Sequence, residues 1–239
     1  MELDERKTVI LKAIVESYIS TGEPVGSRTL SKIGELTLSP ATLRNEMADL
    51  EELGFLEHPH VSSGRVPSDK GYRYYVENIM PKPIVPTDEK EKLKSLIEEK
   101  SHQVNNLVRE IAELYTRMIN YTVFALPSEM SDQIILRGLA NFLSFPEYND
   151  ITKAKRILEF LDDEESLKSA IRPTEQKMDI IIGDENIDDE LKDCSIVVSR
   201  YRTKDNEVGA IGIIGPKRMD YAKAIASLDC IIEELEGDD

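Results

Sequence analysis

The sequence has few of the residues from which metal centres and disulfides are built. Its two cysteines, Cys194 and Cys230, lie far apart and belong to no CxxC pair. In a cytoplasmic chain such cysteines are usually small buried hydrophobic residues rather than disulfide partners. The three histidines, His58, His60 and His102, have no further ligands at zinc spacing. We therefore expect no metal site and no cofactor.

Long apolar runs are also missing. Stretches such as Ile180–Ile182 are far shorter than the roughly 20 residues that a membrane-spanning helix needs. The first five residues are acidic and lack the basic start and apolar core of a secretory signal. With 40% hydrophobic and 32% charged residues, the composition is that of a globular chain. We expect a cytoplasmic protein without membrane contact.

No group of residues suggests catalysis, so we expect no enzyme. Gly209, Gly212 and Gly215 recur at every third position of a strand-like run, which matches neither GxGxxG nor a P-loop. This spacing favours a tightly packed or bending strand. The following Lys217-Arg218 pair is interpreted as part of a solvated turn, with anion binding as the alternative.

The net charge of −16 is unfavourable for binding nucleic acid, because phosphate contacts need lysine and arginine. Residues 1–80 carry nine Lys and Arg against thirteen Asp and Glu, so most of the negative charge lies in the remaining 159 residues. Between His58 and Val76, three basic residues stand against Asp69 alone. A local basic edge therefore exists, although composition by itself does not indicate DNA.

Three parts are visible along the chain. Residues 1–80 form the first, and Pro81, Pro83 and Pro86 then open a linker that leads into a charged helical stretch, so that the second part covers residues 81–120. The third part, residues 121–239, mixes strand and helix patterns. Its expected strands are Thr122–Leu126, Met178–Gly183, Ser195–Arg200 and Val208–Gly215, and its expected helices are Asn149–Ile171 and Met219–Leu235.

The first part reads as a helix-turn-helix followed by a wing. Apolar residues at helical spacing predict a helix over residues 3–20, and Ser27 is the expected N-cap of a second helix, Arg28–Ile33. The third helix has the clearest signals, with Ser39 as N-cap, proline at its first position and Gly54 at its end. The sequence of residues 55–58 then predicts a strand.

The buried stripe of that third helix leaves Ala41, Thr42, Arg44 and Asn45 on its opposite face. These residue types reach base edges: arginine binds guanine, asparagine binds adenine, and small methyl groups contact thymine. Acidic residues gather later in the helix, in the part that usually leaves the groove. The alternative is an exposed polar face in a winged helix that binds another protein.

A turn-rich loop, residues 59–67, is suited to lie along a sugar-phosphate edge. Ser68 is expected to cap a further helix, in which one or two of the three tyrosines pack into the core. The complete candidate DNA-binding set is Ser27, Arg28, Ser39, Ala41, Thr42, Arg44, Asn45, Ser63, Arg65, Lys70 and Arg73.

Three segments together resemble the heat-inducible transcription repressor family HrcA. They are GEPVGSRTL at residues 22–30, LSPATLRNEMADLEELGFLEHPHVSSGRVPSDKGYRYYV at residues 38–76, and GIIGPKRMDYAKAIASLD at residues 212–229. The resemblance implies a dimeric repressor of chaperone genes that binds an inverted-repeat operator and whose activity is tied to the GroE chaperonin. It also implies a winged helix joined to a GAF-like domain.

The chain departs from that family in length. Family members carry an inserted dimerisation domain of about a hundred residues, and here residues 121–127 run almost directly into residues 138–142, which resemble the sequence after the insert. A heptad pattern in residues 87–119 offers another dimer contact, a two-stranded parallel coiled coil. Its seam, here called the heptad seam, consists of Leu93, Ile97, Val104, Leu107, Ile111, Leu114 and Met118. The alternative is that this long helix packs on its own domain.

The sequence thus predicts an α+β protein with an N-terminal winged helix-turn-helix, a long connecting helix and a C-terminal GAF-like α/β sheet domain. We expect a cytoplasmic repressor that binds double-stranded operator DNA as a homodimer and is released on heat-shock stress. Two other functions are weighed against it: a winged-helix module for protein interaction, and a small-molecule sensor based on the acidic GAF-like body.

Overall fold

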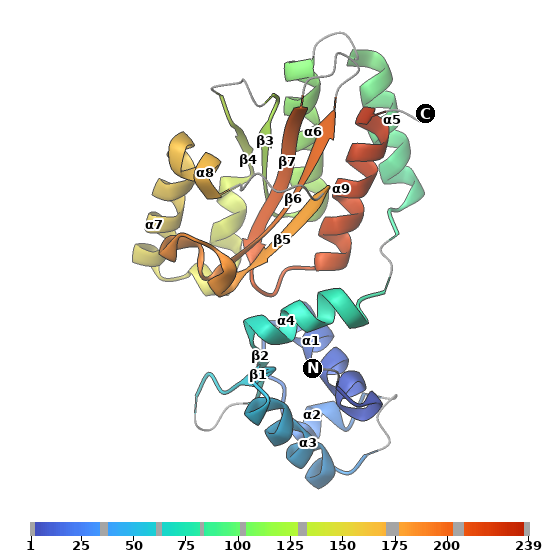
Figure 1. Ribbon diagram of the computed structural model, residues 1–239, viewed down its shortest axis with the longest axis vertical. Helices are drawn as coiled ribbons and strands as arrows, with labels where there is room; N and C mark the ends of the chain where they lie inside the picture. Colours follow the sequence, from blue (N-terminus) through green and yellow to red (C-terminus); the bar gives the residue numbers. More distant parts are fainter. Residues whose placement is uncertain are drawn as a thin grey trace. The chain divides into compact units, whose positions relative to one another are not determined.

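The computed structural model describes residues 3–33, 38–60, 64–81, 84–100, 104–128, 133–170, 177–202 and 208–236. The chain divides into two compact units, Met1–Pro81 and Lys82–Asp239 (Figure 1). Among the described helices, none combines the length and the apolar composition of a membrane span.

The N-terminal unit is a winged helix-turn-helix, as predicted. Helix α2 and helix α3 form the helix-turn-helix, and strands β1 and β2 pair antiparallel as the wing (Figure 1). An isolated bridge between Val25 and Arg65 ties the segment before α2 to the base of the wing. The elements are α1 (Glu5–Thr21), α2 (Ser27–Leu30), α3 (Pro40–Glu52), β1 (Leu56–Glu57), β2 (Val66–Pro67), α4 (Asp69–Tyr74) and the π-helical turn η1 (Tyr75–Ile79).

The signals expected to start and end α3 are confirmed. The Ser39 side chain accepts a hydrogen bond from the backbone N–H of Thr42 at 3.1 Å, which satisfies one of the free N–H groups at the helix start. Pro40 occupies the first helical position. Gly54 follows the helix with a φ of +79°, in the left-handed region that favours glycine.

The prediction for α2 was wrong in its bounds. Gly26, not Ser27, is the N-cap, and the helix ends at Leu30 rather than Ile33. The pairing of Val25 with the wing keeps the backbone extended up to Gly26, so the helix begins immediately afterwards. After Leu30 the backbone N–H groups of Lys32 and Ile33 donate to carbonyls three residues earlier. Such i→i+3 bonds form a tight turn and do not continue the α-helix.

The C-terminal unit is built on one five-stranded antiparallel sheet in the order β4-β3-β7-β6-β5. The four predicted strands are confirmed, β4 was not predicted, and the single helix expected over 149–171 is two helices. The elements are α5 (Thr87–Lys100), α6 (Val104–Ile119), β3 (Thr122–Leu126), β4 (Ile135–Arg137), η2 (Leu139–Ser144), η3 (Pro146–Tyr148), α7 (Ile151–Asp162), α8 (Glu164–Ala170), β5 (Met178–Ile182), η4 (Gly183–Glu185), η5 (Asp189–Leu191), β6 (Cys194–Arg202), β7 (Val208–Pro216) and α9 (Tyr221–Glu236).

Helices cover both faces of this sheet. Helices α6 and α9 lie on one face, where the Ser195 hydroxyl is 2.8 Å from the Tyr221 hydroxyl of α9. On the other face Phe124 and Ile196 belong to a buried cluster with Phe160 of α7 and residues of α8 (Figure 1). Burial on both faces explains why β6 and β7 read as nearly continuous apolar runs. The α+β class is confirmed.

The single long helix expected after the proline linker is instead two helices, α5 and α6, which contact each other and α9. Leu93, Leu107 and Ile111 of the heptad seam are fully or almost fully buried within the unit. A straight helix of this length would span about 45–50 Å. Contact with α6 and α9 buries Leu93.

The structural interpretation of the β7 glycines is confirmed. A Cβ atom added to Gly212 would lie 2.1 Å from the ring of Phe124, and one added to Gly209 would lie 2.4 Å from the ring of Tyr201. The glycines therefore make room for aromatic rings of the neighbouring strands. Arg218 is not part of a solvated turn, because its guanidinium pairs with Glu147 and its side chain is only 13% exposed.

The two cysteines are free and buried, as the sequence predicted. Burial raises the pKa of the Cys194 thiol to about 12. Among the described residues, His, Cys, Asp and Glu side chains form no group of three or more that could hold a metal ion.

Candidate DNA-binding surface

The first turns of α3 present the predicted base-reading side chains to solvent. Ala41, Arg44 and Asn45 are exposed, and Thr42 is half-buried beside Ser39, with their hydroxyl oxygens 2.9 Å apart. Leu43 points the other way and is fully buried. One face of α3 is thus fixed to the core while the opposite face is free to enter a groove.

Arg44 and Asn45 have no ion pair or side-chain hydrogen bond within the part of the chain that the structure describes. Their donors and acceptors are consequently available to a ligand. Arginine offers two parallel donors to guanine, and asparagine offers a donor and an acceptor to adenine. The backbone N–H groups at the start of the same helix favour a phosphate nearby.

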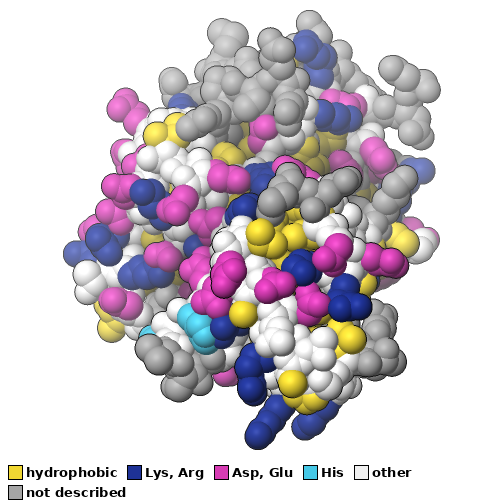
Figure 2. All heavy atoms as spheres, turned by 60° about the horizontal axis from the view of Figure 1, so that its bottom comes forward, with side chains coloured by type: hydrophobic (Ala, Val, Ile, Leu, Met, Phe, Trp, Pro, Cys, Tyr) yellow, Lys and Arg dark blue, Asp and Glu magenta, His cyan; other side chains and the backbone are white. Residues whose placement is uncertain are grey.

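Two further cations lie on and just after α2. Arg28, which was predicted, and Lys32, which was not, are both exposed. Figure 2 shows Lys and Arg side chains in dark blue at the lower edge of the view, over the end of the N-terminal unit that carries α2 and α3. Lys32 stands four residues after Arg28, and this helical spacing is the signal that would have revealed it in the sequence.

The carboxylates of the second half of α3 are bound by cations of the same unit. Lys7 of α1 lies 2.9 Å from Glu46 and 3.2 Å from Asp49, and hydrogen bonds to these two carboxylates hold the pKa of Lys7 above its usual range. Arg65 lies 2.7 Å from Glu51. These pairs connect the acidic half of α3 to α1 and to the wing, and they reduce the repulsion that bare carboxylates would exert on a phosphate backbone.

Arg65 and Lys70, two of the predicted phosphate contacts, already have partners within the protein. Besides its pair with Glu51, the Arg65 guanidinium is 3.1 Å from the His58 ring. The Lys70 ammonium donates to the carbonyl of Leu53 at 2.7 Å and lies over the ring of Phe55. Lys70 therefore satisfies a carbonyl at the end of α3, as basic side chains often do at helix C-termini.

Ser68 joins the end of α3 to the start of α4. Its hydroxyl donates to the carbonyl of Gly54 at 2.6 Å and accepts from the N–H of Gly71 at 3.0 Å. The predicted cap is therefore confirmed, and it has a second bond that the sequence did not reveal. Gly71 is needed here because an added Cβ would lie 2.2 Å from the Phe55 carbonyl oxygen.

The other candidates differ in position. Ser27 lies in the first turn of α2, and Arg73 of α4 pairs weakly with Glu77 at 3.8 Å. Ser63 lies outside the described residues. The structure thus brings the α2 and α3 candidates into one helix-turn-helix, whereas Arg65, Lys70 and Arg73 are engaged in contacts within the unit.

The predicted dimerisation residues are only partly accessible. Ile97, Leu114 and Met118 are half-buried, and the side chain of Val104 lies outside the described residues. The central residues of the heptad seam are already buried in the C-terminal unit. This burial favours the alternative in which these helices cover their own domain.

Comparisons with known proteins agree with this architecture. Residues 85–225 match the family model of the HrcA protein C terminal domain. The heat-inducible transcription repressor HrcA of Clostridium botulinum strain Alaska E43 is 33% identical over 337 aligned positions, covering 99% of this chain and 98% of that protein. The protein of the same name from Thermoanaerobacter pseudethanolicus is 32% identical over 333 positions, covering 99% and 97%.

The first of these alignments is 337 positions long whereas the chain has 239 residues, so at least 98 positions of the relative have no counterpart here. A crystal structure of a hypothetical protein at 2.2 Å resolution shares the fold, with a TM-score of 0.76 and 17% identity over 98% of both chains. The match of the family model and the two relatives' identity over nearly the whole chain establish that this chain belongs to the HrcA family of heat-inducible transcription repressors.

Proposed function

We propose that this repressor binds, as a homodimer, an inverted-repeat operator upstream of heat-shock chaperone genes, with the first half of α3 in the major groove. The observation that carries the proposal is the division of α3 into two halves. Its first half presents Arg44 and Asn45 to solvent without partners among the described residues. Its second half is bound to α1 and the wing through Glu46, Asp49 and Glu51.

Such a helix reads DNA by its first turns while the remainder leaves the groove. One winged helix covers one half-site, and an inverted repeat presents two half-sites related by a two-fold axis. A dimer that binds both therefore has the same symmetry as its operator. Arg28 and Lys32 would contact phosphates and fix the register without reading sequence.

The test is a mobility shift with an inverted-repeat operator and with scrambled DNA of equal length, each over a salt series. We expect Arg44→Ala to weaken the free energy of operator binding by about 1–3 kcal/mol and to relax base specificity at one position of each half-site. Arg28→Ala and Lys32→Ala should weaken both DNAs alike and each lower the salt slope by about 1.

Arg117→Ala serves as the matched control, because Arg117 is an exposed arginine of the C-terminal unit whose recorded partner is Glu113. It should leave both affinities unchanged. An operator-to-scrambled ratio that stays the same in Arg44→Ala would reject base reading by α3.

Release on stress is the second part of the proposal, and it is supported by the word heat-inducible in the names of the relatives. We expect operator binding to fall after brief heating and to recover on incubation with the GroE chaperonin. Recovery at the same rate without the chaperonin would reject that partner.

A further inference from the structure

Arg65 contacts three segments of the N-terminal unit at once. Its backbone N–H and its carbonyl each form a hydrogen bond of 2.9 Å with Val25, in the segment before α2. One terminal nitrogen of its guanidinium lies 2.7 Å from Glu51 of α3. The other lies 3.1 Å from Nδ1 of His58, just after β1. Arg65 itself comes directly before β2, so it connects the helix-turn-helix with both strands of the wing.

The surroundings of Arg65 are tightly packed. Its side chain is only 17% exposed, and its Nε atom is buried. The neighbouring Gly64 comes so close to Val25 that an added Cβ would lie 2.5 Å from the Val25 carbonyl carbon. Arg28 and Lys32, in contrast, are exposed. Arg65 is therefore better placed to hold the wing against α3 than to reach a phosphate.

The contact between Arg65 and His58 requires a neutral imidazole. A guanidinium has donors only and keeps its proton in proteins, so Nδ1 of His58 must accept the bond. A protonated imidazole carries an N–H at Nδ1 as well, and this would turn two donors toward each other and place two cations side by side. Histidine is the side chain whose charge changes between about pH 5 and pH 8. Protonation of His58 would therefore break this contact.

The charges around His58 determine what its protonation does. Among the residues that the structure describes, Arg65 is the only recorded partner of His58. The Glu51 carboxylate of α3 binds the other terminal nitrogen of the same guanidinium and would offset part of the repulsion. On the segment of His58 itself, Glu57 and His60 are exposed. Because Glu51 keeps its bond to Arg65, protonation would loosen the wing without unfolding the unit.

We propose that Arg65 is a positioning residue for operator binding and that neutral His58 keeps it in place, so that operator affinity falls when His58 is protonated. This inference rests on the proposed function, in which the winged helix binds the operator. A wing that is already held in its binding position loses less conformational entropy on binding than a wing that DNA must order. Loss of the His58 contact therefore weakens operator binding without removing any contact to DNA.

The test is operator binding by the full chain in mobility shifts at pH 8 and at pH 6, at constant salt. We expect the affinity of the wild-type chain to fall about two- to tenfold at pH 6, as the loss of one hydrogen bond predicts. His58→Asn places an uncharged oxygen acceptor close to the position of Nδ1, so it should bind equally well at both pH values. His60→Asn is the matched control, because His60 is an exposed histidine of the same loop. It should keep the pH dependence of the wild-type chain.

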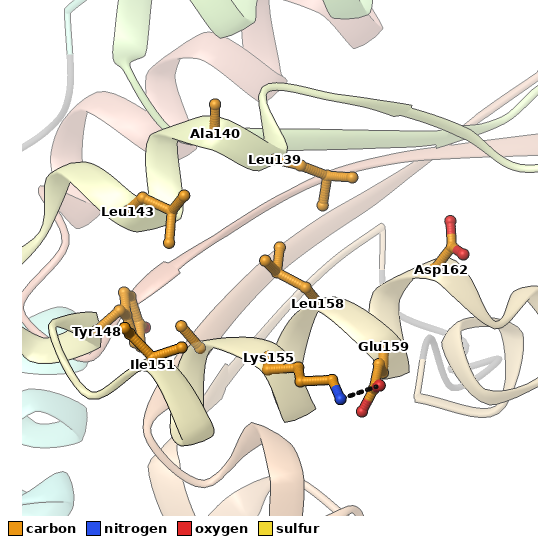
Figure 3. Close-up of a pocket in the computed structure, with 10 residues that line it drawn as sticks. Leu139, Ala140, Leu143, Tyr148, Ile151, Lys155, Leu158, Glu159 and Asp162 are labelled. Atoms are coloured by element: carbon orange, nitrogen blue, oxygen red, sulfur yellow. Dashed lines mark ion pairs between the residues drawn. The ribbon is translucent and has the colours of Figure 1, made fainter.

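Arg65→Ala separates a positioning residue from a phosphate contact. It should weaken operator binding and abolish the pH dependence, yet leave the salt slope unchanged, because no phosphate contact is lost. Lys155→Ala is the matched control, since it also removes a cation from an ion pair. Lys155 lies 3.4 Å from Glu159 on α7, at the rim of a groove between η2 and α7 of the C-terminal unit (Figure 3). This control should bind the operator as the wild-type chain does, and circular dichroism should show both variants folded.

Several results would overturn the proposal. A wild-type affinity that stays the same at pH 6, or that falls equally in His58→Asn, would show that His58 does not control the wing. An affinity that rises at pH 6 for operator and scrambled DNA alike would make His58 a phosphate contact. A salt slope lowered by about 1 in Arg65→Ala would do the same for Arg65.

Failure of the proposed function looks different, because the wild-type chain would then bind operator and scrambled DNA equally at pH 8. Thermal unfolding tests the contact without DNA. Folding favours the neutral imidazole of His58, so lowering the pH from 8 to 6 should reduce the Tm of the N-terminal unit more in the wild-type chain than in His58→Asn. An equal reduction in both chains would contradict the contact itself.

Discussion

Replacing Ser68 with alanine is expected to weaken the junction between the recognition helix and the wing. The Ser68 hydroxyl makes two hydrogen bonds, one to the Gly54 carbonyl at 2.6 Å and one from the Gly71 N–H at 3.0 Å. The residue is 9% exposed, so water has little access to take the place of the hydroxyl. The substitution therefore removes a helix cap and also takes a donor from a carbonyl at the end of α3.

The size of the effect follows from these two losses. Removal of a serine N-cap costs about 0.5–2 kcal/mol, and a buried polar group left without its partner costs about 1–3 kcal/mol. We expect the free energy of unfolding of the N-terminal unit to fall by about 2–4 kcal/mol. In a domain of this size 1 kcal/mol corresponds to about 4–8 °C, so its Tm should fall by about 8–32 °C.

Thermal unfolding followed by circular dichroism measures this effect, and Ser39→Ala is the matched control. Ser39 also caps a helix through one backbone N–H, but it is exposed and, among the described residues, makes no second bond to a buried carbonyl. Ser39→Ala should lower the free energy of unfolding by about 0.5–2 kcal/mol. If Ser68→Ala costs no more than Ser39→Ala, the bond to Gly54 contributes nothing and the reasoning is refuted.

Three further predictions concern the wing, the sheet and the thiols. Lys70→Ala should lower the free energy of unfolding of the N-terminal unit by about 1 kcal/mol and leave the salt slope of DNA binding unchanged. A slope lowered by about 1 in a mobility-shift series would instead show that Lys70 contacts a phosphate. Gly212→Ala should cost about 1–3 kcal/mol in chemical denaturation because its Cβ meets the Phe124 ring, and adding Phe124→Leu should recover part of that loss. A thiol reagent at pH 8 should react slowly with the folded chain, because burial raises the pKa of Cys194 and of Cys230; both should react at once in denaturant, and a fast thiol in the folded chain would contradict their burial.

Much of the N-terminal unit could be predicted because its signals are local. A serine followed by proline predicts the start of α3, and Gly54 predicts its end, since each acts through the backbone of its own neighbours. The apolar stripe of Leu43, Met47 and Leu50 likewise follows from helical spacing alone. The exposed positions of Arg44 and Asn45 are the complement of that stripe.

The break between α5 and α6 could not be predicted in the same way. Residues 100–104 contain neither glycine nor proline, and although Lys100 interrupts one seam position, the heptad pattern resumes at Val104. The two helices pack on each other and on α9, and α9 lies more than a hundred residues later in the chain. The same seven-residue pattern satisfies a coiled coil and a helix that covers its own sheet, so the pattern alone does not choose between them.

The sequence by itself determined the winged helix, four of the five strands of the sheet and the family, because these depend on periodicity, on caps and on motifs that act within a few residues. Only the tertiary structure decided which charges are free. Lys7 meets Glu46 across 39 residues, and Lys70 meets the Leu53 carbonyl across 17. It also placed η2 beside α7, so that Leu143 and Ile151 line one groove. Ion pairs and grooves depend on distances between side chains in space, and separation along the chain does not give those distances.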